Sequence, residues 1–173
     1  WGMTLGRLSE TNMHIFDKPG QTVPEIRAKT RRVIQRNPGK QVVVFIDYLT
    51  LIRPVQFYNG NANQQVTEIS QALKAMAKDL NVPVVCLAQL NRDVEKRQDK
   101  RPMLSDLRDS GSIEQDADVI MFLYRDNYYD KEKDQDNPIS QMEIIVAKNR
   151  NGPTNTVLVT YNKATGEILD EYS

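Results

Sequence analysis

Two apolar runs, each followed by a polar side chain, limit the folds open to this chain. The first run, Val42 to Ile46, is closed by the carboxylate of Asp47, and the second, Val82 to Leu87, is followed by the amide of Gln89. Continuous apolar runs of this kind are typical of buried parallel strands. Polar groups at the carboxyl ends of such strands face the ligand crevice of an open α/β sheet. We therefore expect an α/β protein in which Asp47 and Gln89 project side by side.

A carboxylate in this position predicts a nucleotide site that uses Mg²⁺. The ion keeps several of its waters and takes only one or two protein carboxylates, so Asp47 is expected to hold it through water. In the alternative interpretation, Asp47 only caps a strand or a turn. The spacing of residues leaves both interpretations open.

The segments around the two runs complete the α/β pattern. Thr22-Val23-Pro24-Glu25 is a capping box with proline at the first helical position, which predicts a helix up to Arg36. Apolar residues repeat with a helical period from Gln64 to Leu80, which predicts the crossover helix between the strands. A short helix is expected over Ser112 to Ala117 and a third buried strand over Asp118 to Tyr124. Three more strands are expected to form a C-terminal β-meander: Met142 to Lys148, Thr156 to Tyr161 and Glu167 to Leu169.

Two polar segments separate these elements. The loop from Arg53 to Asn63 contains Phe57 and Tyr58, whose rings can stack on a nucleobase or pack locally, and we favour local packing. The segment from Leu90 to Ser110 is rich in charges of both signs. Because these charges nearly cancel, their number indicates no more than a solvated surface.

Composition excludes several classes of protein. A chain of 173 residues suits one domain, and it has no apolar run near the ~18 residues of a membrane span, so a soluble cytoplasmic protein is expected. With one histidine, His14, and one cysteine, Cys86, neither a zinc cluster nor a serine–histidine hydrolase is indicated. The 23 basic and 23 acidic residues cancel, so any nucleic-acid binding must come from locally placed cations. A G-x-x-x-x-G-K-[ST] phosphate loop is absent from the sequence.

A series of motifs occurs along the chain in the order found in one family. The longest and most specific motif runs from Asp106 to Asp118. The others are Ile46-Asp47-Tyr48-Leu49, Ala88-Gln89-Leu90-Asn91-Arg92, Lys100-Arg101-Pro102 and Lys148-Asn149-Arg150-Asn151-Gly152-Pro153. Over almost its whole length the chain resembles the DnaB-type replicative DNA helicase. Two departures are Asp109, where the family commonly has glutamate, and Thr50, where it commonly has glutamine.

This resemblance implies a RecA-like parallel sheet flanked by helices, with a C-terminal β-meander. It implies a motor domain that assembles into a homo-hexameric ring and hydrolyses ATP, or another nucleoside triphosphate, with Mg²⁺ at subunit boundaries. The ring would translocate on single-stranded DNA and unwind duplex DNA at the replication fork. A helicase loader and a primase are the implied protein partners. The implied location is the cytoplasm, of a bacterial cell or of the host if the source is viral, without a membrane partner.

The resemblance also implies roles for four residues of the nucleotide site. Asp47 resembles the Walker B carboxylate that orients the Mg²⁺ waters, and Gln89 resembles the γ-phosphate sensor. Lys148 and Arg150 resemble cations that reach into the neighbouring subunit's site. Arg150 would act there as an arginine finger, which stabilises charge on the transferred phosphoryl group.

For nucleic acid, Arg108, Asp109 and Gly111 resemble the pore loop that holds the DNA backbone through a cation and through main-chain N–H groups. Copies of Arg108 around a pore would concentrate positive potential that the zero net charge of one chain conceals.

In the family, the phosphate loop and the catalytic glutamate precede the region in which this chain begins. Residues 1–173 are therefore expected to be a partial RecA-like domain, truncated at the N-terminus, of low stability and without ATPase activity on its own. Two other functions stay open. One is a non-catalytic module that binds DNA or a loader, and the other is a RecA-like recombinase, against which the Asp106 to Asp118 motif weighs.

Overall fold

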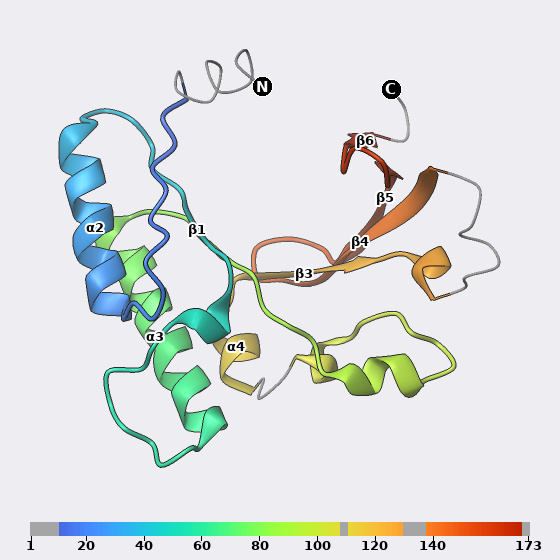
Figure 1. The fold of residues 1–173 in the computed structure, drawn as a ribbon, viewed down its shortest axis with the longest axis horizontal. Coiled ribbons are helices and arrows are strands. Elements are labelled where there is room, and N and C mark those ends of the chain that lie inside the picture. The colour runs from blue at the N-terminus through green and yellow to red at the C-terminus, as the bar shows by residue number, and fades with distance from the viewer. Residues whose placement is uncertain (1–10, 108–110, 130–137, 171–173) are drawn as a thin grey trace.

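The computed structural model describes residues 11–107, 111–129 and 138–170 (Figure 1). Two strands, β1 (Val44–Ile46) and β2 (Val84–Cys86), form a parallel pair, and four more form an antiparallel sheet in the order β3-β4-β5-β6. The antiparallel strands are β3 (Val119–Tyr124), β4 (Ile139–Asn149), β5 (Asn155–Asn162) and β6 (Ile168–Asp170). The helices are α2 (Val23–Arg36), α3 (Ala62–Leu80) and α4 (Gly111–Asp116). This arrangement confirms the expected α/β class with a C-terminal β-meander.

The two long helices begin and end where their capping residues predict. At the start of α2, the Thr22 N–H donates to a Glu25 carboxylate oxygen at 2.7 Å, which completes the capping box. The α3 helix starts two residues before the expected Gln64, because the Asn61 side chain accepts from the Gln64 N–H at 3.1 Å. It ends at Asn81, whose left-handed φ of 50° is tolerated by asparagine.

The first hydrophobic core lies between the parallel pair and the helices α2 and α3. Buried residues of α3 form its centre, and the inward side chains of β1 and β2 pack against them: Ile69, Leu73 and Met76 with Val44, Ile46, Val84 and Cys86. The outward residues of the same strands are exposed, Phe45 by 75% and Val85 by 37%. The expected burial of these strands therefore holds for one face only within the described residues, the face that α2 and α3 cover.

The segment from Asp118 to Tyr124 does form a strand, but the expected burial holds for one of its two faces only. β3 pairs with β4 in an antiparallel register and alternates exposed and buried residues along its length. Its inward residues Ile120 and Phe122 belong to a second core, whereas Met121 and Leu123 are exposed by 58% and 64%. An antiparallel strand needs only one covered face. A continuous run of apolar residues does not show whether a strand is buried on one face or on both.

The short helix α4 lies between the two cores. Its residue Ile113 packs against the α3 cluster and also against the β3 cluster. The Ser70 hydroxyl of α3 donates to the Asp116 carboxylate at 2.7 Å, which fixes the end of α4 to α3. Within the described ranges, no helix is long and apolar enough to span a membrane.

Candidate functional site

The edge at which β1 and β2 end carries two exposed polar side chains. The ladder continues beyond the strands, because the Leu87 N–H donates to the Ile46 carbonyl at 3.0 Å and the Leu49 N–H donates to the Leu87 carbonyl at 2.9 Å. Asp47 follows β1 and Gln89 follows β2, so the structure places both at this edge. Neither side chain has a hydrogen bond or ion pair within the part of the chain that the structure describes.

The chemistry of this edge fits a magnesium–nucleotide complex. The described residues contain no group of three or more carboxylate, histidine or cysteine side chains that would ligate a metal directly. A lone exposed carboxylate suits Mg²⁺, which keeps most of its waters. The neighbouring amide of Gln89 has N–H donors that suit a phosphate oxygen and no charge that would compete for the metal.

The residue after Gln89 is paired with the end of the following charged segment. Leu90 and Leu107 form an antiparallel β-bridge, and the Asn91 N–H donates to the Asp106 carbonyl at 2.7 Å. Leu107 is buried in the second core. The chain therefore leaves Gln89, forms a closed loop, and returns beside it at Leu107, directly before Arg108.

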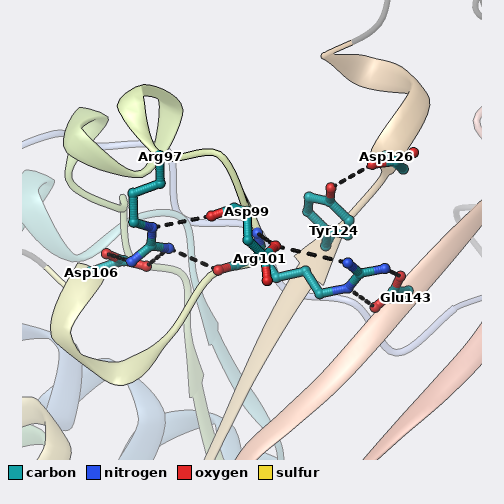
Figure 2. Close-up of polar contacts among 7 residues, drawn as sticks. All are labelled: Arg97, Asp99, Arg101, Asp106, Tyr124, Asp126 and Glu143. Atoms are coloured by element: carbon teal, nitrogen blue, oxygen red, sulfur yellow. Dashed lines mark hydrogen bonds and ion pairs between the residues drawn. The ribbon is translucent and has the colours of Figure 1, made fainter.

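Charged side chains hold this closed loop in place (Figure 2). The buried carboxylate of Asp106 accepts from Arg97 at 3.0 and 2.7 Å and from the Met103 N–H at 2.8 Å. Arg101 donates twice to Glu143 of β4, at 3.0 and 2.7 Å. Most of these charged side chains are exposed, as the interpretation of a solvated surface expects, but Asp106 is buried and paired with Arg97, which a charge count does not show.

The Arg101 guanidinium also lies over the ring of Tyr124 in β3, 5.0 Å from its centroid. The Tyr124 hydroxyl donates to Asp126 at 2.8 Å (Figure 2). Burial, helped by this hydrogen bond to a carboxylate, raises the pKa of Tyr124 to about 12. The closed loop is thus fastened to both β3 and β4 of the antiparallel sheet.

Lys148 and Arg150 lie at the end of β4, beside the end of α4. The Lys148 ammonium donates to the main-chain carbonyls of Glu114 and Gln115. Arg150 donates to the Gln115 carbonyl at 2.8 Å and forms an ion pair with Asp118 at 3.3 Å. Lys148 is in β4 and Arg150 directly follows its last residue, Asn149, and both side chains reach the main-chain carbonyls at the end of α4.

The predicted pore loop falls partly outside the described residues. Arg108 and Asp109 lie outside them, and Gly111 is the first residue of α4. A Cβ placed on Gly111 would meet no other atom within 4 Å. The described neighbours of the loop are Leu107 on one side and α4 on the other, so both of its ends are anchored.

The aromatic loop between β1 and α3 differs from expectation. Phe57 is 90% exposed, so the predicted local packing is wrong for this ring. Tyr58 is half-buried and its hydroxyl donates to Gln56 at 3.3 Å. The loop backbone is fastened by Glu68 of α3, whose carboxylate accepts from the N–H groups of Val55 and Gln56 at 2.7 and 3.2 Å.

Sequence reasoning assigned no role to Asp118, which lies among three cations. Besides Arg150, its carboxylate pairs with Lys74 of α3 at 2.5 Å, and both interactions together with nearby Lys148 lower its pKa, the hydrogen bond from Lys74 most. The contact between Asp118 and Arg150 follows from the pairing of β3 with β4, which the sequence alone does not give. β3 pairs with β4 through Val119 and Asn149, so Asp118 stands opposite Arg150.

Comparison with known proteins gives related sequences over almost the whole chain. Residues 2–170 match the model of the family described as DnaB-like helicase C terminal domain. The chain is 52% identical to the replicative DNA helicase DnaC of Bacillus subtilis (strain 168), over 98% of this chain and 37% of the relative. It is also 52% identical to the replicative DNA helicase DnaB of Geobacillus stearothermophilus, with the same two coverages of 98% and 37%. The chain therefore spans little more than a third of these relatives.

Two solved structures share the fold. One is described as an ATPase domain, with a TM-score of 0.90 and 51% identity over 98% of this chain and 58% of that chain. The other shows a DnaB-like replicative helicase and its interactions with primase, with a TM-score of 0.90 and 51% identity over 98% of this chain and 40% of that chain. These likenesses confirm the expected RecA-like architecture.

Proposed function

Because the chain belongs to the DnaB-like helicase C-terminal domain family, we propose that it is part of the motor of a hexameric, ATP-dependent replicative DNA helicase. In this proposal the complete protein translocates on single-stranded DNA and unwinds duplex DNA at the replication fork. The names of the relatives and of the solved structures favour this function over a recombinase.

The observation that carries the proposal is the exposed edge at Asp47 and Gln89. At the carboxyl ends of adjacent parallel strands, two polar side chains without a partner among the described residues are arranged for a ligand. Asp47 would hold Mg²⁺ through water, and Gln89 would donate to the terminal phosphate. When bound, Mg²⁺ would offset the negative charge of the phosphates. The amide of Gln89 would transmit loss of that phosphate through the Leu90–Leu107 bridge to the pore loop.

Lys148 and Arg150 are assigned to the neighbouring subunit's nucleotide. Support comes from their common contact with the end of α4 and from the exposure of the Arg150 side chain, which is 48%. A guanidinium has five N–H donors in a planar fork, so donors remain beyond those used for Gln115 and Asp118. These donors are suited to a phosphoryl group with developing negative charge.

The loop of Arg108, Asp109 and Gly111 is assigned to the DNA backbone in the ring pore. Its supports are the anchored flanks, the Leu90–Leu107 bridge before it and α4 after it. A cation and main-chain N–H groups bind phosphates without reading base identity. This loop would therefore grip single-stranded DNA of any sequence.

For partners, we propose a primase, a helicase loader and identical subunits. The primase rests on the solved helicase described with its interactions with primase. The loader, the hexamer and the cytoplasmic location, in a bacterial cell or in the host of a virus, follow from family membership.

Residues 1–173 are proposed to form a partial RecA-like domain without ATPase activity of its own. The sequence has no G-x-x-x-x-G-K-[ST] loop, and Asp47 and Gln89 act on a phosphate only after such a loop has fixed it. Phosphate release by these residues alone that disappears in Asp47→Ala would contradict this assignment.

Asp47→Ala in the complete protein tests the proposed function. We expect DNA-stimulated phosphate release and strand separation to fall to background, while the mass of the assembled ring is unchanged. Asp17→Ala, which removes another exposed carboxylate, is the control and should keep both activities. Unwinding by Asp47→Ala at the wild-type rate would refute the nucleotide role of this edge.

A further inference from the structure

The register of the antiparallel sheet sets Asp118 opposite Arg150. Val119 and Asn149 are the last partners of the β3–β4 ladder, and one step beyond them the Arg150 N–H donates to the Asp118 carbonyl at 2.8 Å. Their side chains follow the same pairing, with the guanidinium 3.3 Å from the carboxylate. The main-chain hydrogen bond therefore fixes the position of the Arg150 backbone, and the ion pair with Asp118 restricts the position of the guanidinium.

Asp118 is itself held from the side of α3. The Lys74 ammonium lies 2.5 Å from a carboxylate oxygen of Asp118, and the Lys74 side chain is only 25% exposed. The other carboxylate oxygen is the one that faces Arg150. One carboxylate oxygen of Asp118 thus pairs with Lys74 of α3, and the other pairs with Arg150.

The end of α4 contributes the remaining contacts of this cluster. The last carbonyls of a helix have no intrahelical partners and carry partial negative charge. Here those of Glu114 and Gln115 accept from Lys148, and that of Gln115 also accepts from Arg150. Four separate elements therefore meet in the cluster around Asp118 and Arg150: α3, α4, the start of β3 and the end of β4.

We propose that Asp118 is a positioning residue that, with the Gln115 carbonyl, holds the Arg150 guanidinium in the orientation from which it reaches the neighbouring subunit's nucleotide. This inference rests on the proposed function of Arg150. The Gln115 carbonyl accepts from Nη2 of Arg150 and the Asp118 carboxylate lies 3.3 Å from Nη1. A guanidinium has five N–H donors, so donors remain for a phosphate. Because the pair is half-exposed, it restricts Arg150 without locking it.

A double-mutant cycle in the complete, ring-forming protein tests this role. Asp118→Asn should lower kcat for nucleotide hydrolysis about tenfold, since a small misplacement of a reacting group costs one to two orders of magnitude. KM, the affinity for a non-hydrolysable nucleotide and the ring mass should stay as in the wild type, and the melting temperature should fall only slightly, since half-exposed ion pairs stabilise a fold little. In an Arg150→Ala background, Asp118→Asn should have no further effect, because it acts through Arg150.

The chain supplies a matched control in the pair of Arg27 and Asp79, which joins α2 to α3. Asp79 is 50% exposed, as Asp118 is, and its oxygen lies 2.7 Å from Arg27. Asp79→Asn should leave kcat unchanged. Asp118→Glu keeps the charge but changes the reach, and we expect a smaller loss of kcat than in Asp118→Asn.

The outcomes separate the inference from the function on which it rests. A normal kcat in Asp118→Asn, together with a slow Arg150→Ala, would overturn the positioning role and leave the trans role of Arg150 intact. An unchanged rate in Arg150→Ala would refute both. A further loss on adding Asp118→Asn to Arg150→Ala would show that Asp118 acts by another route. If Asp118→Asn fails to assemble, the same cycle with Asp118→Glu decides.

Discussion

At the ends of β1 and β2, Asp47 and Gln89 are exposed and have no side-chain partner in the described chain, whereas Lys148 and Arg150 at the end of β4 are bonded to α4 and Asp118. Both pairs are assigned to nucleotide phosphates, but only the second is held by its own subunit. The difference follows from side-chain length. A short carboxylate or amide on a strand end is placed by the backbone, while a long cation loses rotamer freedom of about 2 kcal/mol and needs partners to direct it.

Substitutions in the two pairs should therefore have different effects on the structure. Removing a side chain without protein partners removes ligand contacts and little else. Removing one that is held by the fold, or that holds another, also changes local structure.

The largest effect is expected for Arg150→Ala in the complete protein. An arginine finger contributes ~10³ to 10⁵ in rate, so hydrolysis should fall by at least the lower figure. Nucleotide affinity and ring mass should be nearly unchanged, because an arginine finger acts mainly on the charge that develops in the transition state. Steady-state phosphate release with native mass measurement checks this. Arg27→Ala, at another half-exposed arginine in an ion pair, should hydrolyse normally.

A clear loss of local stability is expected for Asp106→Ala. This buried carboxylate accepts from Arg97 and from the Met103 N–H. Its removal leaves the Met103 N–H without this acceptor, while Arg97 keeps its bonds to the carbonyls of Asp99 and Arg101. Losing hydrogen bonds of this kind costs about 2 kcal/mol here, since Arg97 keeps some access to water. Hydrogen exchange across residues 90–107 should become faster by the corresponding factor. Unchanged protection would mean that Asp106 does not hold the loop.

The contrasting expectation concerns the stability of Gln89→Ala and Asp47→Asn. Surface substitutions away from any bonded feature change the free energy of unfolding by about 0.5 kcal/mol or less. The melting temperature should therefore match the wild type while hydrolysis is lost. A marked drop in melting temperature would show that these side chains have structural partners and would remove the contrast between the two pairs.

The smallest expected effect is a pH-dependent reactivity next to this edge. Burial raises the pKa of the Cys86 thiol to about 11. The thiol should therefore react slowly with a disulfide reagent at pH 8 and faster as the pH rises toward 11, because the thiolate is the nucleophile. Because the folded state favours the neutral thiol, Cys86 contributes less to the free energy of unfolding as the pH rises from 8 toward 11. Mass spectrometry of the Cys86 peptide, with urea-unfolded protein as the control, measures the rate.

Much of the fold could be predicted from local signals. The capping box at Thr22, the helical period up to Leu80 and the turns of the meander each depend on neighbours in sequence, and each prediction is confirmed within a few residues. Within the described residues, the predicted burial of β1 and β3 holds for one face only, because a run of apolar residues does not show which faces of a strand are covered.

For the site, the strand ends could be predicted from the apolar runs, and the paired cations from the family resemblance. The partners of those cations could not be predicted. The contact between Asp118 and Arg150 joins residues far apart in the chain and depends on the β3–β4 register. Lys148 and Arg150 bind main-chain carbonyls of α4. Every residue has such a carbonyl, so the residue types do not show which carbonyls are used. Long-range register and main-chain acceptors are the two kinds of information that a sequence pattern lacks.

We propose that Asp47 and Gln89 of one subunit and Lys148 and Arg150 of the next form one nucleotide site. Mixed rings of Arg150→Ala and Asp47→Ala subunits put this to the test. At a boundary where an intact Asp47 of one subunit meets an intact Arg150 of the next, hydrolysis should recover, although each variant alone is inactive. Rings shown by native mass to be mixed, yet with no recovery, would refute the shared site and confine Arg150 to its own subunit.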